Sequence, residues 1–207
     1  MAPPEGPPGP ERPSEREAGP VGDFNRNPTD PRIGRVVVSR HQIEARVTEL
    51  GRQITLDYRD RPRLLLVGVL KGAFVFMSDL ARAIDTAVEV DFMAVSSYGS
   101  ATKSSGVVRI VKDLDADLRG RHVLLVEDIV DSGLTLSYVR KNLSARAPAS
   151  LEACALLVRQ GLQKHDPELR YVGFDIPPEF VIGYGLDVDE AYRNLRDVCV
   201  YEESGAP

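Results

Sequence analysis

Four continuous apolar runs constrain the fold of this chain more than any other feature. They are RLLLVGVL at 63–70, VEVDFMAVSSY at 88–98, HVLLVEDIV at 122–130 and SLEACALLV at 150–158. Stretches with helical periodicity separate them, such as residues 73–84 and 134–147. Strands that are apolar throughout are covered on both faces, which is typical of parallel sheets with helical crossovers. The sequence therefore predicts an α/β fold with a mostly parallel, doubly wound central sheet flanked by helices.

The N-terminal segment differs in composition from the rest of the chain. Residues 1–31 are rich in Pro, Gly, Glu and Arg and have few large apolar side chains, so we expect a disordered tail. The folded domain is expected to span 32–207. Near its start, Ser39 is the expected N-cap of a helix whose apolar positions recur with helical spacing. These positions are Ile43, Val47, Leu50 and Ile54.

Composition excludes several classes of protein. The chain has 207 residues, 43% hydrophobic and 28% charged, which suits one globular domain. No apolar run approaches the roughly 20 residues of a membrane helix, and the N-terminal segment lacks the apolar core of a signal peptide. The net charge of -5 argues against a nucleic-acid partner, which usually needs a basic surface. We therefore expect a cytoplasmic protein with no membrane or nucleic-acid partner.

The segment from Val123 to Leu136 carries the chemistry. Its apolar run ends in two adjacent carboxylates, Glu127 and Asp128, at the strand end where open α/β sheets place ligands. Such a pair suits a metal ion or a diol. Three residues after Asp128, a short polar and glycine-containing stretch precedes a helical pattern, so exposed backbone N–H groups could hold a phosphate. That stretch is Asp131, Ser132, Gly133, Leu134 and Thr135.

The plainest alternative is an ordinary strand end followed by an Asp N-cap. The whole pattern of carboxylates followed by a phosphate cradle favours a phosphorylated sugar instead. The P-loop and dinucleotide fingerprints GxxxxGK[ST] and GxGxxG are both absent, which argues against a P-loop kinase or a nicotinamide enzyme.

VLLVEDIVDSGLTL resembles the phosphoribosyl pyrophosphate signature of type I phosphoribosyltransferases, and specifically the hypoxanthine-guanine phosphoribosyltransferase family. The resemblance runs from about residue 35 to 201. It includes VLKGAFVFMSDLARAI, FMAVSSYGSATKSSGVVRIVKDLD and YVGFDIPPEFVIGYGLDVDEAYRNL. It implies the type I fold, with a core at about 60–160 and a small hood from about 32–40 and 165–203.

The implied activity is transfer of the 5-phosphoribosyl group from phosphoribosyl pyrophosphate to hypoxanthine or guanine. The products are IMP or GMP and pyrophosphate, in purine salvage. The resemblance also implies Mg²⁺ as cofactor, these small molecules as substrates, and assembly as a homodimer or homotetramer.

Roles follow from the resemblance position by position. Asp131 lies beside purine N7 as general base, and Glu127 and Asp128 engage the ribose hydroxyls and Mg²⁺. Asp187 is a second metal and purine-side carboxylate. The resemblance assigns the contacts with the phosphate groups to Lys71, Gly72, Ser132, Gly133, Leu134, Thr135 and Arg193. The Leu70-Lys71-Gly72 turn is expected to contain a non-proline cis peptide bond.

On the purine side, the resemblance assigns ring stacking to Phe180 and recognition of the exocyclic edge to the Val181 carbonyl. Ser97 and Tyr98 open a loop expected to be mobile and to cover the reacting centre. At Arg159 the sequence departs from the family, which usually has a lysine that donates to the 6-oxo group. Arginine also donates but is wider and planar, which leaves the preference among hypoxanthine, guanine and xanthine open.

Two other functions are compatible with the fold. A regulator could keep the phosphate cradle as a sensor, but it would need a basic nucleic-acid-binding face. A transferase acting on adenine or orotate is the other, although EFVIGYGLD fits the 6-oxopurine branch better.

Overall fold

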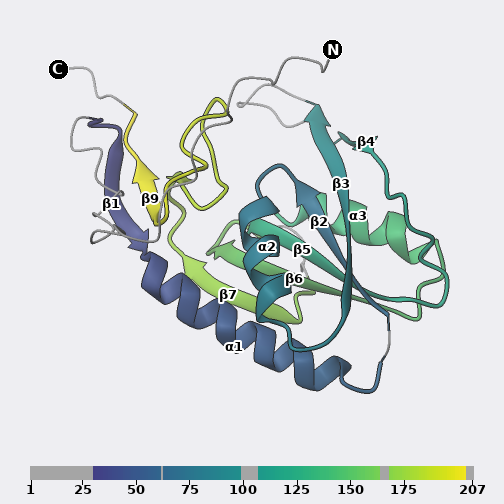
Figure 1. Ribbon diagram of the computed structural model, residues 1–207. Helices are drawn as coiled ribbons and strands as arrows, with labels where there is room; N and C mark the ends of the chain where they lie inside the picture. The colour runs from purple at the N-terminus through teal and green to yellow at the C-terminus, as the bar shows by residue number, and fades with distance from the viewer. Residues whose placement is uncertain (1–29, 62, 99–106, 164–167, 204–207) are drawn as a thin grey trace, which may run out of the picture.

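The computed structural model describes residues 30–61, 63–98, 107–163 and 168–203. Its larger sheet has six strands in the order β4-β3-β2-β5-β6-β7 (Figure 1). In chain order these are β2 (Leu64–Leu70), β3 (Val88–Tyr98), β4 (Val107–Lys112), β5 (His122–Val130), β6 (Ser150–Arg159) and β7 (Tyr171–Ile176). Neighbours are parallel except β3 and β4, which are antiparallel. The predicted α/β fold with a mostly parallel sheet is confirmed.

Helices cover both faces of this sheet, as expected for strands that are apolar throughout. Side chains alternate along β2: Leu64 and Leu66 pack with residues of the helices α1 (Arg40–Tyr58) and α2 (Phe74–Ala83). Leu65 and Val67 face the opposite way, into a second core with α3 (Leu134–Ser144). In Figure 1, α2 lies in front of the sheet and α3 behind it.

The first helix begins where the sequence predicts. The Ser39 Oγ accepts from the Gln42 backbone N–H, and the Gln42 side chain accepts from the Ser39 backbone N–H at 3.0 Å. This capping box satisfies two N–H groups that a helix end otherwise leaves unpaired. The predicted apolar positions of α1 are all buried, so the helix is held by its packing against α2 and β7.

A smaller antiparallel sheet joins the two ends of the domain. It has the order β1-β9-β8, with β1 at Ile33–Val38, β8 at Val181–Ile182 and β9 at Val198–Tyr201. It lies to one side of the large sheet, on the left in Figure 1. The expected hood range of 165–203 also contains β7, but β7 pairs with β6 and belongs to the large sheet.

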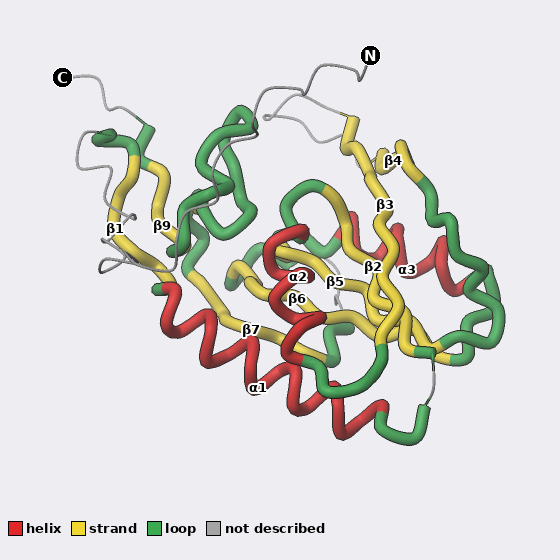
Figure 2. Tube along the Cα trace, viewed as in Figure 1, coloured by secondary structure: helices red, strands yellow, loops and turns green. Residues whose placement is uncertain are grey.

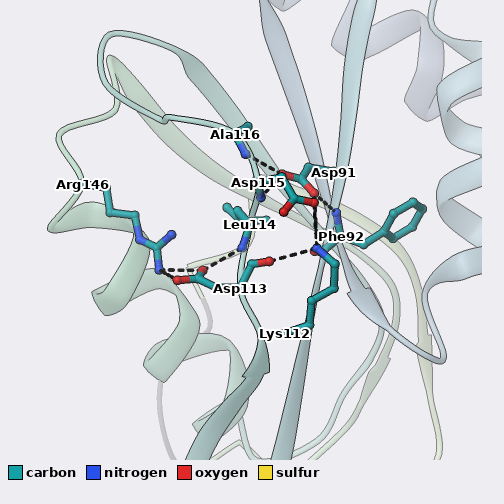
Figure 3. Close-up of polar contacts among 8 residues, drawn as sticks. All are labelled: Asp91, Phe92, Lys112, Asp113, Leu114, Asp115, Ala116 and Arg146. Carbon is teal, nitrogen blue, oxygen red and sulfur yellow. Dashed lines mark hydrogen bonds and ion pairs between the residues drawn. The ribbon is translucent and has the colours of Figure 1, made fainter.

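The β3–β4 pair is anchored at its base by a carboxylate (Figure 3). Asp91 accepts from the backbone N–H groups of Asp115 and Ala116, both at 2.9 Å, and from Phe92 at 2.7 Å. Lys112 donates to the carbonyl of Phe92 at 2.9 Å. The connection that follows β4 is therefore fixed to the start of β3. β4 itself pairs antiparallel with the second half of β3, from Ala94 to Tyr98.

Two expectations concern parts that the structure describes little or not at all. The predicted tail lies outside the described residues except for positions 30 and 31, and so does the loop at 99–106. None of the described helices is long and apolar enough to cross a membrane.

Candidate active site

The candidate site lies where the strand order of the large sheet reverses. From β2 the chain continues to β3 on one side, and from β5 it continues to β6 on the other. Open α/β sheets bind ligands at the carboxyl ends of strands at such a point. The turn after β2 carries Lys71 and Gly72, and the end of β5 carries Glu127 and Asp128. Residues far apart in the sequence thus meet at one edge of the sheet.

Gly72 is packed between two other segments of the site. A Cβ placed on Gly72 would lie 1.6 Å from Asp128 Oδ2. On the other side, a Cβ on Gly185, whose φ is +101°, would lie 2.2 Å from the Gly72 carbonyl oxygen. Only glycine fits at either position. The Leu70–Lys71 peptide bond is cis, as the resemblance implies.

Glu127 and Asp128 are buried acids beside each other. Burial raises the pKa of Glu127 well above its usual range, and the charge of Asp128 adds to this. Burial also raises the pKa of Asp128 to about 6, although the Ile129 N–H, 2.8 Å from Oδ1, favours the ionised form. Two acids that resist ionisation when alone would be stabilised as carboxylates by a cation or by hydroxyl donors. Their environment suits a metal–diol site.

The segment after β5 forms the predicted cradle. Gly133 is the N-cap of α3 and has a φ of +77°, a left-handed conformation that glycine adopts without strain. The first turn of α3 contains no acidic residue, so its N–H groups and the positive end of the helix can face an anion. A pocket of about 220 Å³ is lined by residues 127–136. The predicted phosphate residues Ser132, Gly133, Leu134 and Thr135 are therefore gathered around one cavity.

A second group of charges comes from the loop between β8 and β9, which Figure 2 shows as the long green segment leading to β9. Arg193 donates to the Gly185 carbonyl at 2.8 Å and forms an ion pair with Asp187 at 2.8 Å. Glu190 pairs with Arg193 at 3.2 Å and with Lys71 at 3.0 Å. The structure thus brings together, through Glu190, the two basic residues predicted to contact phosphate.

Sequence reasoning missed Glu190 and Gly185 in this group. The available signal for Gly185 was the pair of glycines that flank Tyr184. In the structure both glycines have positive φ, and a Cβ on either would collide with a backbone atom of a distant segment. No local signal distinguishes Glu190 from other surface acids; its role depends on contacts made by the fold.

Arg159, the residue that departs from the family, lies between two other predicted site residues. Its Nη1 donates to Asp131 Oδ2 at 3.1 Å, and its Cζ lies 5.7 Å from the centroid of the Phe180 ring. Gln163 supports it by donating to the Arg159 carbonyl. The predicted general base and the predicted purine-stacking ring are therefore both in contact with one guanidinium group.

The remaining predicted residues are placed but less closely connected. Val181 is buried in β8 and pairs with Val200 of β9. Ser97 and Tyr98 end β3, and their backbones pair with β4; their side chains lie outside the described part of the structure. Their expected role as a lid stays a prediction.

The residues present fit magnesium bound together with a phosphorylated substrate. Within the described ranges, no three His, Cys, Asp or Glu side chains are placed to hold a metal ion by themselves. Magnesium usually takes one or two carboxylates and completes its octahedron with water and substrate phosphates. Glu127 and Asp128 provide such a pair, whereas Asp187 is paired with Arg193.

Comparison with known proteins defines the class first. A family model described as "Phosphoribosyl transferase domain" matches residues 37–189, which span the parallel sheet, the cradle and part of the β8–β9 loop. The fold is thus that of a phosphoribosyltransferase, and the candidate site lies largely within the matched region.

Individual relatives define the branch. The hypoxanthine-guanine phosphoribosyltransferase of Mycobacterium avium is 56% identical, with 83% of this chain and 89% of that protein aligned. A solved hypoxanthine phosphoribosyltransferase from Staphylococcus aureus has a TM-score of 0.78 and 43% identity, covering 83% of this chain and 92% of the other. One from Trypanosoma cruzi has a TM-score of 0.79 and 39% identity, covering 84% and 93%. The chain belongs to the hypoxanthine-guanine phosphoribosyltransferase family.

Proposed function

We propose that this enzyme transfers the 5-phosphoribosyl group of phosphoribosyl pyrophosphate to hypoxanthine or guanine, giving IMP or GMP and pyrophosphate. This proposal rests on one observation. Glu127, Asp128 and the cradle at 131–135 line one pocket, at the point where the strand order of the sheet reverses. The identity of 56% to the M. avium enzyme supports the choice of base.

The cradle and the charged loop divide the substrate between them. Backbone N–H groups at the start of α3 and the hydroxyls of Ser132 and Thr135 hold the 5'-phosphate. Glu127 and Asp128 accept from the ribose hydroxyls. Lys71 and Arg193, which both pair with Glu190, bind the pyrophosphate and neutralise the charge that develops as it departs.

Asp131 performs the proton transfer in this proposal. As the purine nitrogen bonds to C1' of the ribose, the bond from C1' to the pyrophosphate oxygen breaks and pyrophosphate leaves with that electron pair. Asp131 accepts the proton from N7, so that no positive charge stays on the purine. Its side chain is 47% exposed, which leaves it accessible to a bound base.

Magnesium is the proposed cofactor, held by Glu127 and Asp128. When bound, it supplies Lewis-acid stabilisation of the pyrophosphate leaving group. The raised pKa values of both acids support the assignment, because a cation would restore their ionised forms.

Nucleotide formation by the purified protein tests the proposed function. Phosphoribosyl pyrophosphate and Mg²⁺ would be supplied with hypoxanthine, guanine, xanthine, adenine or orotate in separate reactions, with products separated by chromatography. We expect IMP and GMP, and no product after chelation of Mg²⁺. Formation of AMP or orotidine phosphate alone would assign another transferase, and binding of phosphoribosyl pyrophosphate without any product would favour a sensor.

We also propose that the enzyme is a homodimer or homotetramer whose copies meet at the groove beside α2. This groove has a volume of about 490 Å³ and is lined by residues of α1, α2 and the β8–β9 loop. Phe74 is 43% exposed there, a large apolar surface for a monomer to leave in water. In the T. cruzi enzyme, the C-terminal region has a role in the oligomeric state and the enzymatic activity. Light scattering after size exclusion would give the molar mass.

A further inference from the structure

The guanidinium group of Arg159 makes two independent contacts inside the site. It forms an ion pair with Asp131, and it lies within the roughly 6 Å range of a cation–π contact over Phe180. Arg159 is 14% exposed, whereas Phe180 is 49% exposed and presents its ring to solvent. The arginine is thus held over a ring that is otherwise half exposed.

One donor of this guanidinium group is unused. The Arg159 Nε is buried and has no hydrogen-bond partner among the described residues. A buried donor without an acceptor is costly, and a ligand that supplies an acceptor removes that cost. The 6-oxo group of hypoxanthine or guanine is such an acceptor, whereas the 6-amino group of adenine is a donor.

The two partners of Arg159 are also the residues that the family resemblance assigns to the face and the N7 edge of the purine. Phe180 takes the face of the base, and Asp131 takes its N7 edge. A planar guanidinium group stacks on aromatic rings much as a base does. Because a base stacked on that side of the Phe180 ring would need the space of the guanidinium group, both cannot occupy it together.

We propose that Arg159 fills the purine subsite of the base-free enzyme and selects the base that displaces it. An incoming 6-oxopurine takes over the ring of Phe180 and gives the displaced guanidinium group a 6-oxo acceptor. Adenine would also stack on the Phe180 ring, but its 6-amino group offers the displaced guanidinium group no acceptor. Binding of adenine is therefore disfavoured. This inference rests on the proposed function and concerns the same site.

Substitution by lysine separates displacement from recognition. Arg159→Lys keeps the positive charge and an N–H donor but removes the planar group from the ring. We expect the KM for hypoxanthine to fall about fivefold, the KM for phosphoribosyl pyrophosphate to stay unchanged and kcat to change less than about twofold. The Kd of IMP, measured by calorimetry, should fall with the KM, and this reading needs no turnover.

A double-mutant cycle with Phe180 tests whether the ring is the shared element. In the Phe180→Leu background, Arg159→Lys should change the KM for hypoxanthine by less than about twofold, since there is no ring left to compete for. The matched control is Arg170→Lys. Arg170 is likewise ion-paired, to Asp57 at 2.9 Å, and lies 5.6 Å from the Tyr171 centroid, outside the site. It should leave every kinetic constant unchanged.

Other outcomes are separable. An unchanged or higher KM for hypoxanthine in Arg159→Lys, or an equal effect in both Phe180 backgrounds, would overturn the displacement model while leaving the transferase assignment intact. If the unmodified enzyme forms neither IMP nor GMP, the proposed function itself fails.

Discussion

At the scale of single residues, Gly72 has no room for a side chain. Gly72→Ala must displace either the Asp128 carboxylate or the turn, because the new Cβ would lie 1.6 Å from Asp128 Oδ2. We expect the free energy of unfolding to fall by about 1–3 kcal/mol. We also expect kcat/KM for phosphoribosyl pyrophosphate to fall about tenfold or more. Denaturant titration and initial rates measure the two effects.

Gly120→Ala is the matched control. Gly120 has a φ of +70° and nothing within 4 Å of a built Cβ, so alanine there meets conformational strain but no collision. Gly120→Ala should lower the free energy of unfolding by about 1–2 kcal/mol and leave kcat/KM within about twofold of the unmodified enzyme. If Gly72→Ala behaved like this control, the close contact with Asp128 would have no functional role.

How much of the site the sequence predicts depends on how local each contact is. Glu127, Asp128 and the cradle at 131–135 are contiguous, so one motif places them all around one pocket. The contact of Arg159 with both Asp131 and Phe180 joins segments that lie more than 20 residues apart, and no spacing rule predicts it. The same holds for Glu190 and its two basic partners.

At the scale of elements, Asp91 holds the connection after β4 against the start of β3. Burial alone would raise the pKa of Asp91, but backbone N–H donors from Ala116, Phe92 and Asp115, with Lys112 nearby, outweigh it and lower the pKa. Asp91→Asn should reduce the free energy of unfolding by about 1–3 kcal/mol at pH 7.

The pH dependence of this effect has a definite sign. Because the folded pKa lies below the unfolded value of about 3.9, the contribution is complete above that value. It is lost as the pH falls through the lower folded pKa. Urea titrations between pH 7 and pH 3 give the free energy of unfolding of Asp91→Asn and of the unmodified protein. The difference between these two free energies should therefore shrink only at the acid end. Asp85→Asn, at an exposed position, serves as control; an equal loss there would contradict the anchor.

The sequence predicts the elements of the large sheet more completely than their partners. The apolar runs give β2, β3, β5 and β6 nearly to the residue, since burial on both faces leaves a continuous pattern. β7, YVGFDI, is shorter and mixed, so its place beside β6 rather than in the hood had no local signal.

At the scale of the whole molecule, the site exists only because three separated regions meet. The turn after β2, the end of β5 with the start of α3, and the β8–β9 loop approach one another at Gly72 and Gly185. The parallel sheet fixes the first two, and the smaller sheet fixes the third through β8 and β9. Asp197, which is buried, accepts from the Arg40 backbone N–H at 2.6 Å and ties that loop to the start of α1.

In the proposed function, Asp131 accepts the purine proton, and the neighbouring cradle binds phosphoribosyl pyrophosphate independently of it. The most direct measurement is kcat for IMP formation by Asp131→Asn under saturating substrates, with calorimetric binding of phosphoribosyl pyrophosphate alongside. We predict that kcat falls about a hundredfold or more while the Kd changes less than about threefold. A kcat within about fivefold of the unmodified enzyme would contradict the account.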